Sequence, residues 1–516
     1  MNRAEPRKQA RRSTRAAASR PRVLLVWPGG LFSNAGSAGV PQLLHLAQAI
    51  ALRVDAHVDV IDLDMERALG PVDLGPLLAG GYDVVGLSCY SSYDFLKVMA
   101  LAGAVRQQLP EATIVAGGYH VSARPADLLT AGSPVDYAVV GDGEGPFARL
   151  VEAVTAGRRP LQRVLGPEAF RDPNSLMPYD WSLLSRYRSV IRTHTDQLEL
   201  YLARGCPYDC SFCMERAKRE TAWRPIDAEG AVEELHRADA YFDLRGKSLR
   251  IPDPLFGMRS AWRKTFLEGL ARRPIRAEKV WLVMRADLID RTDMELMARA
   301  NVAVGFGLES GDPGQLRRIR KTGKLAGFLD KMLRIGEWAR ALNVPFGANI
   351  IVGHPGETET SMRVSARYME KLFLGPHGTH GFLAVDPFRL YPGSPIDEDL
   401  DGWREQTGMR AHHYPWWYDG DQAFLSEWID PSDSLSYERA EQLRYELFGP
   451  IVAEIPKRFA YTGQGREYMM RAPRREAASM GADRRARMRA LHALWRDVHQ
   501  QLGQAAIATT RAHRPS

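Results

Sequence analysis

Residues 204–213 read Arg204-Gly205-Cys206-Pro207-Tyr208-Asp209-Cys210-Ser211-Phe212-Cys213. Three of the four cysteines in a chain of 516 residues lie in this stretch, with the spacing C-x3-C-x2-C. Thiolates are the preferred ligands of iron–sulfur clusters. Three cysteines can each bind one iron of a [4Fe–4S] cluster and leave the fourth iron without a protein ligand. The stretch therefore predicts a cluster with one iron open to chemistry.

Two other interpretations of the cysteines were weighed. Positions i, i+4 and i+7 share a helix face and would suit buried core cysteines, but Gly205 and Pro207 disfavour a helix through Cys206. A structural zinc site would need a fourth ligand nearby, and apart from the three cysteines neither His nor Cys occurs between His194 and His236. A non-catalytic metal module that binds a partner through its basic ends remains the alternative from a different functional class.

With Phe212 before its last cysteine, the pattern C-x3-C-x-aromatic-C resembles the signature of the radical S-adenosylmethionine (SAM) family. The resemblance implies that the open iron binds the amino and carboxylate groups of SAM. One electron from the cluster then cleaves SAM to methionine and a 5′-deoxyadenosyl radical. By this resemblance Cys206, Cys210 and Cys213 are the metal ligands and catalytic residues, and a cellular reductant such as flavodoxin or ferredoxin is a partner.

Charge and hydropathy argue against several classes of partner. The net charge is +7, but most of the excess lies near the two ends, and no basic stripe with interleaved aromatic residues occurs in the middle. Nucleic acid is therefore not the expected substrate. No run of about 18 apolar residues occurs, so no membrane span is expected. Residues 1–21 are expected to form a disordered basic tail, and the clustered cysteines indicate a reducing, cytoplasmic setting.

Short apolar segments alternate with amphipathic ones between residues 22 and 159. The pattern predicts strands at 22–28, 58–63, 83–88, 113–116 and 137–140, and helices at 42–52, 95–109 and 146–156. Such alternation predicts an α/β domain with a Rossmann-like, doubly wound parallel sheet. Ligands bind these sheets at the carboxyl ends of the strands, where the turns 27–30, 88–92, 117–120 and 141–145 would lie.

Several of these turns resemble the cobalamin-binding domain that precedes many radical SAM domains. The resemblance is carried by Gly117-Gly118-Tyr119-His120, Pro125, residues 135–137 and Gly141-Asp142-Gly143-Glu144. It implies cobalamin as a cofactor. The cofactor contacts that it implies are Tyr90, Gly117, Gly118, His120, Gly141, Gly143 and Glu144.

One departure from the cobalamin-binding pattern concerns the cobalt ligand. Many such domains carry D-x-H-x-x-G after the first strand, whereas residues 27–32 read Trp-Pro-Gly-Gly-Leu-Phe, and His57 lies just before the second strand without the glycine. Bound cobalamin is thus expected to lack a protein histidine on its lower face, with the turn 89–93 as a candidate wall. Cys89 is either a buried thiol or a ligand. His120 either caps a turn or contacts the cofactor.

After a proline-punctuated linker at 160–197, a second alternation runs from 198 to 400. Strands are expected at 198–203, 249–252, 280–285, 303–308, 346–352 and 383–390. The intervening helices are expected at 228–242, 260–271, 293–300, 325–341 and 359–372. Six strand–helix units predict a partial (β/α)6 barrel with its chemistry at the carboxyl ends of the strands.

The residues that follow these strands are polar. Each could be an ordinary turn or helix cap, but their order after the cysteines resembles the SAM-binding barrel of the cobalamin-associated subfamily. The resemblance implies that Arg285 and Glu309 contact the ribose or methionine end of SAM, and that Gly353 and its strand lie behind the adenine. Phe212 of the signature is a further expected cofactor contact.

Residues 401–516 are expected to be mostly helical, with helices at 436–448 and 477–505. The aromatic segment 412–418 would either cover the barrel mouth and shape a substrate pocket or pack within this C-terminal region. The family resemblance implies a methyltransferase that passes a methyl group from SAM through methylcobalamin to an unactivated carbon of a small molecule or natural product. The alternative is a radical SAM enzyme of another type, catalysing a cyclisation or rearrangement with or without cobalamin.

Overall fold

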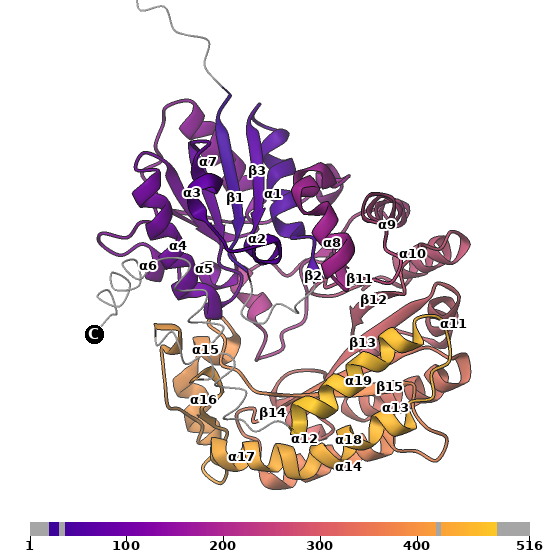
Figure 1. Ribbon diagram of the computed structural model, residues 1–516. Helices are drawn as coiled ribbons and strands as arrows, with labels where there is room; N and C mark the ends of the chain where they lie inside the picture. The colour runs from indigo at the N-terminus through magenta and orange to yellow at the C-terminus, as the bar shows by residue number, and fades with distance from the viewer. Residues whose placement is uncertain (1–19, 30–36, 419–424, 482–516) are drawn as a thin grey trace, which may run out of the picture.

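Two parallel β-sheets organise the computed structural model, which describes residues 20–29, 37–418 and 425–481 (Figure 1). The first sheet confirms the expected doubly wound α/β domain. Its spatial order is β3 (His57–Asp62), β1 (Arg22–Trp27), β4 (Val84–Ser88), β5 (Thr113–Gly117), β6 (Tyr137–Gly141) and β7 (Val164–Glu168). Its helices are α1 (Pro41–Ala51), α2 (Leu63–Leu69), α3 (Leu74–Leu78), α4 (Phe95–Gln108), α5 (Tyr119–Ala123), α6 (Pro125–Leu128) and α7 (Glu144–Thr155).

The apolar run of β1 explains why helices cover both faces of this sheet. Successive strand residues point to opposite faces. Val23 and Leu25 belong to the core that also holds residues of α1 and α7. Leu24 and Val26 belong to a separate core with residues of α4. A strand that is apolar on both faces is stable only when both faces are covered, as in parallel α/β sheets.

The first sheet extends beyond the domain end expected at residue 159. The sixth strand, β7, pairs with β6 through Ala138 and Val164 inside the segment expected to be linker. Its exposed, Gly- and Pro-containing sequence lacks the apolar signal of a buried strand. Further along, α8 (Arg188–His194) lies between the two domains.

The second sheet contains the six expected parallel strands and one more. Its order is β15 (Gly381–Pro387), β14 (Phe346–Val352), β13 (Val302–Glu309), β12 (Lys279–Met284), β11 (Ser248–Ile251), β8 (Gln197–Glu199) and β2 (Ser37–Ala38). The extra strand, β2, comes from the chain between β1 and α1 and pairs with β8. The N-terminal part of the chain thus closes one edge of the barrel sheet.

The strand expected at 198–203 is divided in two. After β8, the chain forms β9 (Ala203–Arg204), which pairs antiparallel with β10 (Arg224–Pro225). The cysteine stretch is the loop of this hairpin, and η4 (Met214–Lys218), a 3-10 helix, follows the last cysteine. The cysteine loop contacts residues that follow the barrel strands, such as Arg285 after β12.

Helices cover the outside of the barrel sheet (Figure 1). They are α9 (Ala228–Phe242), α10 (Ser260–Arg272), α11 (Arg291–Arg299), α12 (Pro313–Arg318), α13 (Leu325–Leu342) and α14 (Glu359–Phe373). The C-terminal region adds α15 (Pro395–Glu398), α16 (Leu400–Thr407), α17 (Tyr437–Leu443), α18 (Gly449–Arg458) and α19 (Arg466–Gly481). The helix expected at 436–448 is α17 plus a π-helical turn at Arg444–Phe448 that continues into α18.

Part of the expected C-terminal structure cannot be compared. The helix expected at 477–505 lies mostly outside the described residues, and the described helix there, α19, begins earlier, at Arg466. The tail expected at 1–21 also lies almost wholly outside them. In the described part of the chain, none of the helices combines the length and apolarity that crossing a bilayer requires.

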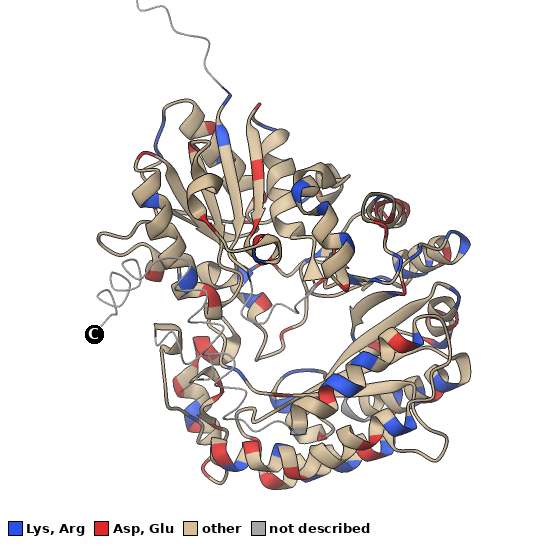
Figure 2. Ribbon diagram, in the orientation of Figure 1, with Lys and Arg blue, Asp and Glu red and all other residues tan. Residues whose placement is uncertain are grey.

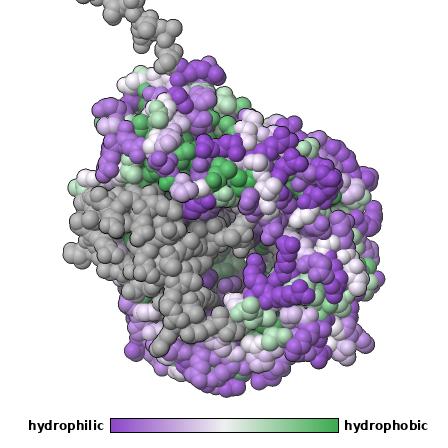
Figure 3. All heavy atoms as spheres, in the orientation of Figure 1, coloured by the Kyte–Doolittle hydropathy of each residue, from purple (hydrophilic) through white to green (hydrophobic). Residues whose placement is uncertain are grey.

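Charge and hydropathy follow this arrangement. Charged residues gather on the outer helices, such as α17 and α18, while the strands carry few (Figure 2). Hydrophilic residues cover most of the visible barrel face (Figure 3).

Candidate functional site

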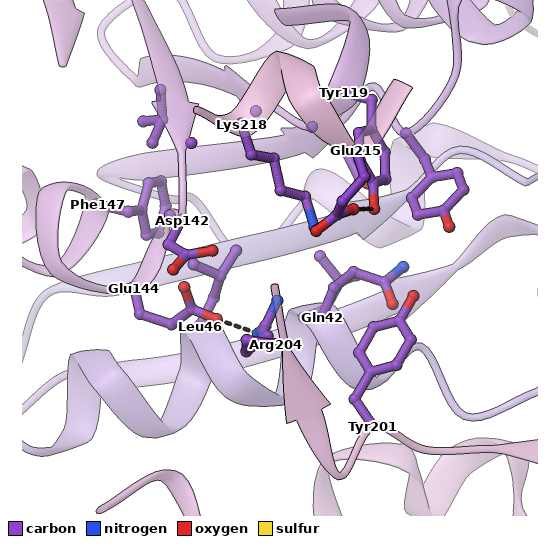
Figure 4. A pocket seen from close by; sticks show the side chains of 18 of the residues that line it. Gln42, Leu46, Tyr119, Asp142, Glu144, Phe147, Tyr201, Arg204, Glu215 and Lys218 are labelled. Atoms are coloured by element: carbon purple, nitrogen blue, oxygen red, sulfur yellow. Dashed lines mark hydrogen bonds and ion pairs between the residues drawn. The ribbon is translucent and has the colours of Figure 1, made fainter. Parts of the chain in front are cut away.

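A cavity of about 290 Å³ lies between the carboxyl edge of the first sheet and the cysteine hairpin; we call it the interdomain cavity. Its wall from the first domain includes Gln42, Tyr90, Gly117, Gly118, Tyr119, Gly141, Asp142, Gly143 and Glu144. The rest of the chain contributes Tyr201, Arg204, Cys206, Cys213, Glu215 and Lys218 to its lining. Figure 4 shows Glu215 and Lys218 beside Tyr119, and Arg204 beside Glu144. Six of the seven expected cobalamin contacts and two of the three expected cluster ligands therefore face one space.

The glycines of this cavity fall into two kinds. Gly118 has φ +123°, and a Cβ there would lie 2.2 Å from the carbonyl oxygen of Cys89, so the turn itself requires glycine. A Cβ on Gly117 would come no closer than 3.7 Å to the protein. Glycine at 117 is therefore not demanded by the fold, and it leaves room for a ligand to approach the sheet edge. This is what a large planar cofactor needs, so the cradle fits cobalamin.

Acidic and basic groups meet along one side of the cavity (Figure 4). Glu144 forms an ion pair with Arg204, and its other carboxylate oxygen has no hydrogen-bond partner in the structure although it is buried. Arg224 Nη1 donates to Asp142 Oδ2 over 2.8 Å. Burial would raise the pKa of Asp142, but Arg204 and Arg224 lower it overall. The free oxygen of Glu144 leaves a polar position open to a ligand.

Tyrosines line the remaining polar part of the cavity. Tyr119 donates to Glu215, and the ammonium of Lys218 lies 4.3 Å from the centre of the Tyr119 ring. Burial raises the pKa of Tyr90 to about 12, and burial also raises the pKa of Tyr201. Both phenols therefore stay protonated at neutral pH and act as hydrogen-bond donors.

The three cysteines lie close enough to influence one another electrostatically. Burial, followed by the neighbouring Cys210, raises the pKa of both Cys206 and Cys213, the latter to about 12. Among the described residues, no three His, Cys, Asp or Glu side chains are arranged around a single metal ion. In a [4Fe–4S] cluster each thiolate binds a different iron, so its ligands stand farther apart than those of one ion. Three such thiols fit a cluster.

The expected SAM contacts of the barrel lie around Cys210. Nη1 of Arg285 is 3.9 Å from the Cys210 sulfur, and Arg285 also binds Asp287. Glu309 has φ +68°, a conformation unusual for its residue type, and forms a 2.9 Å ion pair with Lys321. A buried arginine, lysine and glutamate therefore lie near the Cys210 thiol. Neither Arg285 nor Glu309 lines the interdomain cavity.

Two other expected contacts lie on the far side of the cysteine loop. The ring of Phe212 packs 5.3 Å from the ring of His354, which is buried with no hydrogen-bond partner in the structure for either nitrogen. Gly353, with φ +85°, donates its N–H to Glu357 over 2.5 Å. They flank the barrel face of the cysteine loop and not the interdomain cavity.

His120 does not line the interdomain cavity. It is 2% exposed, its Nδ1 is 2.8 Å from Ser92 Oγ, and its ring packs against Phe95 and Trp417. Burial lowers its pKa to about 3. The structure therefore favours a packing role for His120 over a cofactor contact. No histidine is found among the described residues that line the cavity.

Cys89 and the aromatic segment also pack internally. Cys89 is fully buried, and burial raises the pKa of its thiol. Trp417 donates to Asp127 over 2.7 Å, and Trp416 packs 4.7 Å from Tyr93. The segment 412–418 thus contacts the first domain and holds it to the C-terminal region.

Several residues of the site went unassigned in the sequence. Arg224 and Lys321 lie outside the motifs that the sequence analysis identifies. Arg204 and Asp142 lie within such motifs, but the sequence assigns them no role. The sequence signal that could have indicated their pairing is charge, because Asp142 and Glu144 are acidic whereas Arg204 and Arg224, on either side of the cysteines, are basic. The pairing itself depends on two domains meeting.

Comparisons with known families agree with this architecture. The B12 binding domain model matches residues 44–151, and the Radical SAM superfamily model matches residues 200–369. These two segments contain the carboxyl edge of the first sheet and the cysteine hairpin.

Curated relatives are distant. The chain is 27% identical over 368 residues, 64% of its length and 50% of the relative's, to the cobalamin-dependent radical SAM methyltransferase TokK of Streptomyces tokunonensis. It is 25% identical over 394 residues, 71% of its length and 74% of the relative's, to the anaerobic magnesium-protoporphyrin IX monomethyl ester cyclase of a Synechocystis species. The chain spans about half the length of TokK.

A solved structure shares the fold. It is that of the radical SAM methyltransferase TsrM from Kitasatospora setae with cobalamin and a [4Fe–4S] cluster bound. The TM-score is 0.65 at 18% identity, covering 88% of this chain and 99% of that one. The chain therefore combines a B12-binding domain with a radical SAM domain that follows it.

Proposed function

We propose that the protein is a cobalamin-dependent radical SAM methyltransferase that methylates an unactivated carbon of a small molecule or natural product. One observation carries the proposal: the glycine edge of the cobalamin-type domain and the thiols of Cys206 and Cys213 face the same interdomain cavity. An arrangement that holds two cofactors across one space suits a reaction that uses both.

The relatives support this reaction class. Most of the curated matches are methyltransferases, and TsrM has also been solved with a tryptophan substrate and a SAM analogue bound. That likeness supports a small-molecule substrate.

Residues of both walls would hold the cofactors. Cys206, Cys210 and Cys213 would ligate the cluster, and Gly117 with the Gly141–Glu144 turn would hold cobalamin. Arg285 and Glu309 would contact SAM near Cys210, Gly353 and its strand would lie behind the adenine, and Phe212 would be a further cofactor contact. Tyr90 would contact the cobalamin, because it lines the interdomain cavity.

When bound, the cluster with SAM supplies a radical that removes a substrate hydrogen, and cobalamin supplies the methyl group. The chain's own contribution is positioning in a closed space. Tyr90 and Tyr201 keep their protons, because burial raises their pKa values, and so they orient ligands as donors without exchanging protons. Arg285 places a fixed positive charge beside the Cys210 sulfur. The cluster that Cys206, Cys210 and Cys213 would hold, together with the absence of a disulfide among the four cysteines, is the basis for proposing a reducing, cytoplasmic location with a flavodoxin- or ferredoxin-type donor.

A second candidate is a radical SAM cyclase. It is favoured by the Synechocystis cyclase, which the chain matches over 71% of its length. In that case no methyl group would be transferred, whether or not cobalamin binds in the interdomain cavity.

Anaerobic incubation of the reconstituted chain with SAM, a reductant and cobalamin separates the two candidates. A methyltransferase forms both S-adenosylhomocysteine and 5′-deoxyadenosine. Formation of 5′-deoxyadenosine alone, with no S-adenosylhomocysteine above a cobalamin-free control, overturns the methyltransferase proposal and favours the cyclase.

A further inference from the structure

The cysteine stretch is the loop of a hairpin whose two strands carry one arginine each. Arg204 of β9 and Arg224 of β10 are register partners, directly opposite each other. The hairpin is tight at its entrance: Gly205 has φ +75°, and a Cβ there would lie 2.1 Å from the carbonyl oxygen of Ala222. Movement of either arginine therefore moves the base of the loop that carries the cysteines.

Each arginine binds an acidic side chain of the other domain. Arg224 Nη1 lies 2.8 Å from Asp142 Oδ2, and Arg204 forms an ion pair with Glu144. Both acids come from residues 141–144, where β6 passes into α7, and this segment also contains the cavity glycines Gly141 and Gly143. Asp142 and Glu144 lie side by side in Figure 4. Two separate ion pairs thus join this segment to both strands of the cysteine hairpin.

Both pairs are buried. The side chains of Arg224 and Asp142 are 11% and 3% exposed, and those of Arg204 and Glu144 are 13% and 3% exposed. Buried pairs depend strongly on geometry, since a partner that moves away leaves an uncompensated charge in a low dielectric. The two domains therefore cannot separate here at low cost.

Further contacts hold the paired groups from behind. The backbone N–H of Phe170 donates to Asp142 Oδ2 over 3.0 Å. Arg204 Nη2 lies 2.6 Å from Nδ1 of His45, which is buried and accepts the hydrogen bond. Glu144 is the first residue of α7, where the helix dipole favours a carboxylate. Neither acid is free to swing away from its arginine.

We propose that the ion pairs Arg204–Glu144 and Arg224–Asp142 form a double ionic clamp. This clamp fixes the distance between residues 141–144 of the first domain and the loop that carries the cysteines. The four side chains are positioning residues. Their effect on chemistry rests on the proposed function, because a fixed spacing matters most when a methyl group passes between SAM and cobalamin. Their effect on the protein alone does not rest on it.

The first test measures the full-length chain without added cofactors. Arg224→Gln is compared with Arg224→Lys, which keeps a charge for Asp142, and with Arg149→Gln, which breaks an exposed pair between α7 and Glu168 of β7. Amide hydrogen exchange is followed in residues 141–145 and 203–225. The clamp predicts faster exchange in both segments for Arg224→Gln and near wild-type exchange for the other two variants. Exchange that is unchanged in Arg224→Gln overturns the clamp.

The second test uses the reconstituted chain with SAM, reductant and cobalamin as the probe mixture. In Arg224→Gln, loss of the fixed distance between the two segments is expected to reduce S-adenosylhomocysteine formation by roughly tenfold to a hundredfold, as for a reacting group displaced by about 1 Å. Formation of 5′-deoxyadenosine is expected to stay near wild type. A parallel loss of both products indicates general damage and overturns the positioning role. If wild type forms no S-adenosylhomocysteine, the methyltransferase proposal fails, and hydrogen exchange still decides the clamp.

A variant that does not fold leaves the clamp testable. The double change Arg224→Gln with Asp142→Asn removes both charges of one pair, so no buried charge is left uncompensated. The clamp predicts that this variant folds and still shows faster exchange in both segments. Wild-type exchange in the folded double variant overturns it.

Discussion

The guanidinium of Arg285 lies over the ring of Tyr208, 3.6 Å from its centre, and its Nη1 is 3.9 Å from the sulfur of Cys210. A cation at this position favours the more negatively charged, reduced form of a cluster. Arg285→Gln is therefore expected to make the cluster's reduction potential more negative. A unit charge at 4 Å is worth about 4 kcal/mol at an effective dielectric of about 20, and Asp287 cancels part of it, so the expected shift is roughly 50–100 mV.

A redox titration followed by electron paramagnetic resonance measures this shift. The matched control is Arg291→Gln, which removes an exposed arginine paired with Glu295. Equal potentials in Arg285→Gln and wild type would show that this arginine does not act on the cluster.

Loss of a cluster ligand gives the most direct test of the cysteine assignment. Cys210→Ala is expected to lose nearly all bound iron and sulfide after anaerobic reconstitution, and all 5′-deoxyadenosine formation, because two thiolates do not hold a [4Fe–4S] cluster. Cys89→Ala is the control, since Cys89 is buried in the first domain and does not itself line the interdomain cavity. A full iron content in Cys210→Ala contradicts the assignment.

The adjacent glycines Gly117 and Gly118 at the end of β5 are expected to have different roles, Gly118 in folding and Gly117 in cobalamin binding. Gly118→Ala is expected to destabilise the protein by more than about 3 kcal/mol, because its Cβ would meet the Cys89 carbonyl at a positive φ. Gly117→Ala meets nothing closer than 3.7 Å and is expected to fold normally but to bind cobalamin more weakly. Thermal unfolding and a cobalamin titration check both. Unchanged cobalamin affinity in a folded Gly117→Ala chain counts against the cradle.

Removal of the buried histidine distinguishes packing from ligation. His120→Ala is expected to cost about 2–4 kcal/mol of unfolding free energy, because the ring is fully packed against Phe95 and Trp417. The absorption spectrum of bound cobalamin is expected to stay as in wild type. A change in that spectrum would show that His120 reaches the cobalt after all.

Asp253 at the end of β11 predicts a pH dependence of stability. Burial raises its pKa to about 7, against hydrogen bonds and Arg204, which lower it. The folded chain then binds one proton more than the unfolded chain between the ordinary aspartate pKa and about pH 7. This group's contribution to stability is fully present below the ordinary value and is lost as the pH rises to about 7. The slope from this group is at most about 1.4 kcal/mol per pH unit.

Asp253→Asn removes the titration and keeps an acceptor for the N–H of Leu202. Urea unfolding at several pH values between about 5 and 8 is expected to show a flatter stability profile for the variant. Parallel profiles for variant and wild type would mean that Asp253 is ionised in the folded protein throughout this range.

Much of the architecture followed from the order of residues along the chain. Apolar runs such as Val23–Val26 are buried on both faces wherever they occur, so β1 and its parallel neighbours were predictable from local pattern. The proposal that Cys206, Cys210 and Cys213 ligate a cluster also comes from local pattern, because the three thiols lie within eight residues of one another in the chain.

The tertiary structure decided which side chains share a space. β2 gives no apolar signal, and it becomes a strand only because the edge of β8 offers unpaired backbone groups. The role of His120 depended on whether its turn faced the cavity or the core, which one chain segment cannot specify. The pairing of Arg224 with Asp142 joins residues 82 positions apart, and burial between two domains makes that pairing strong. The local sequence pattern determines whether a segment forms a helix or a strand, whereas packing between distant segments determines which side chains are in contact.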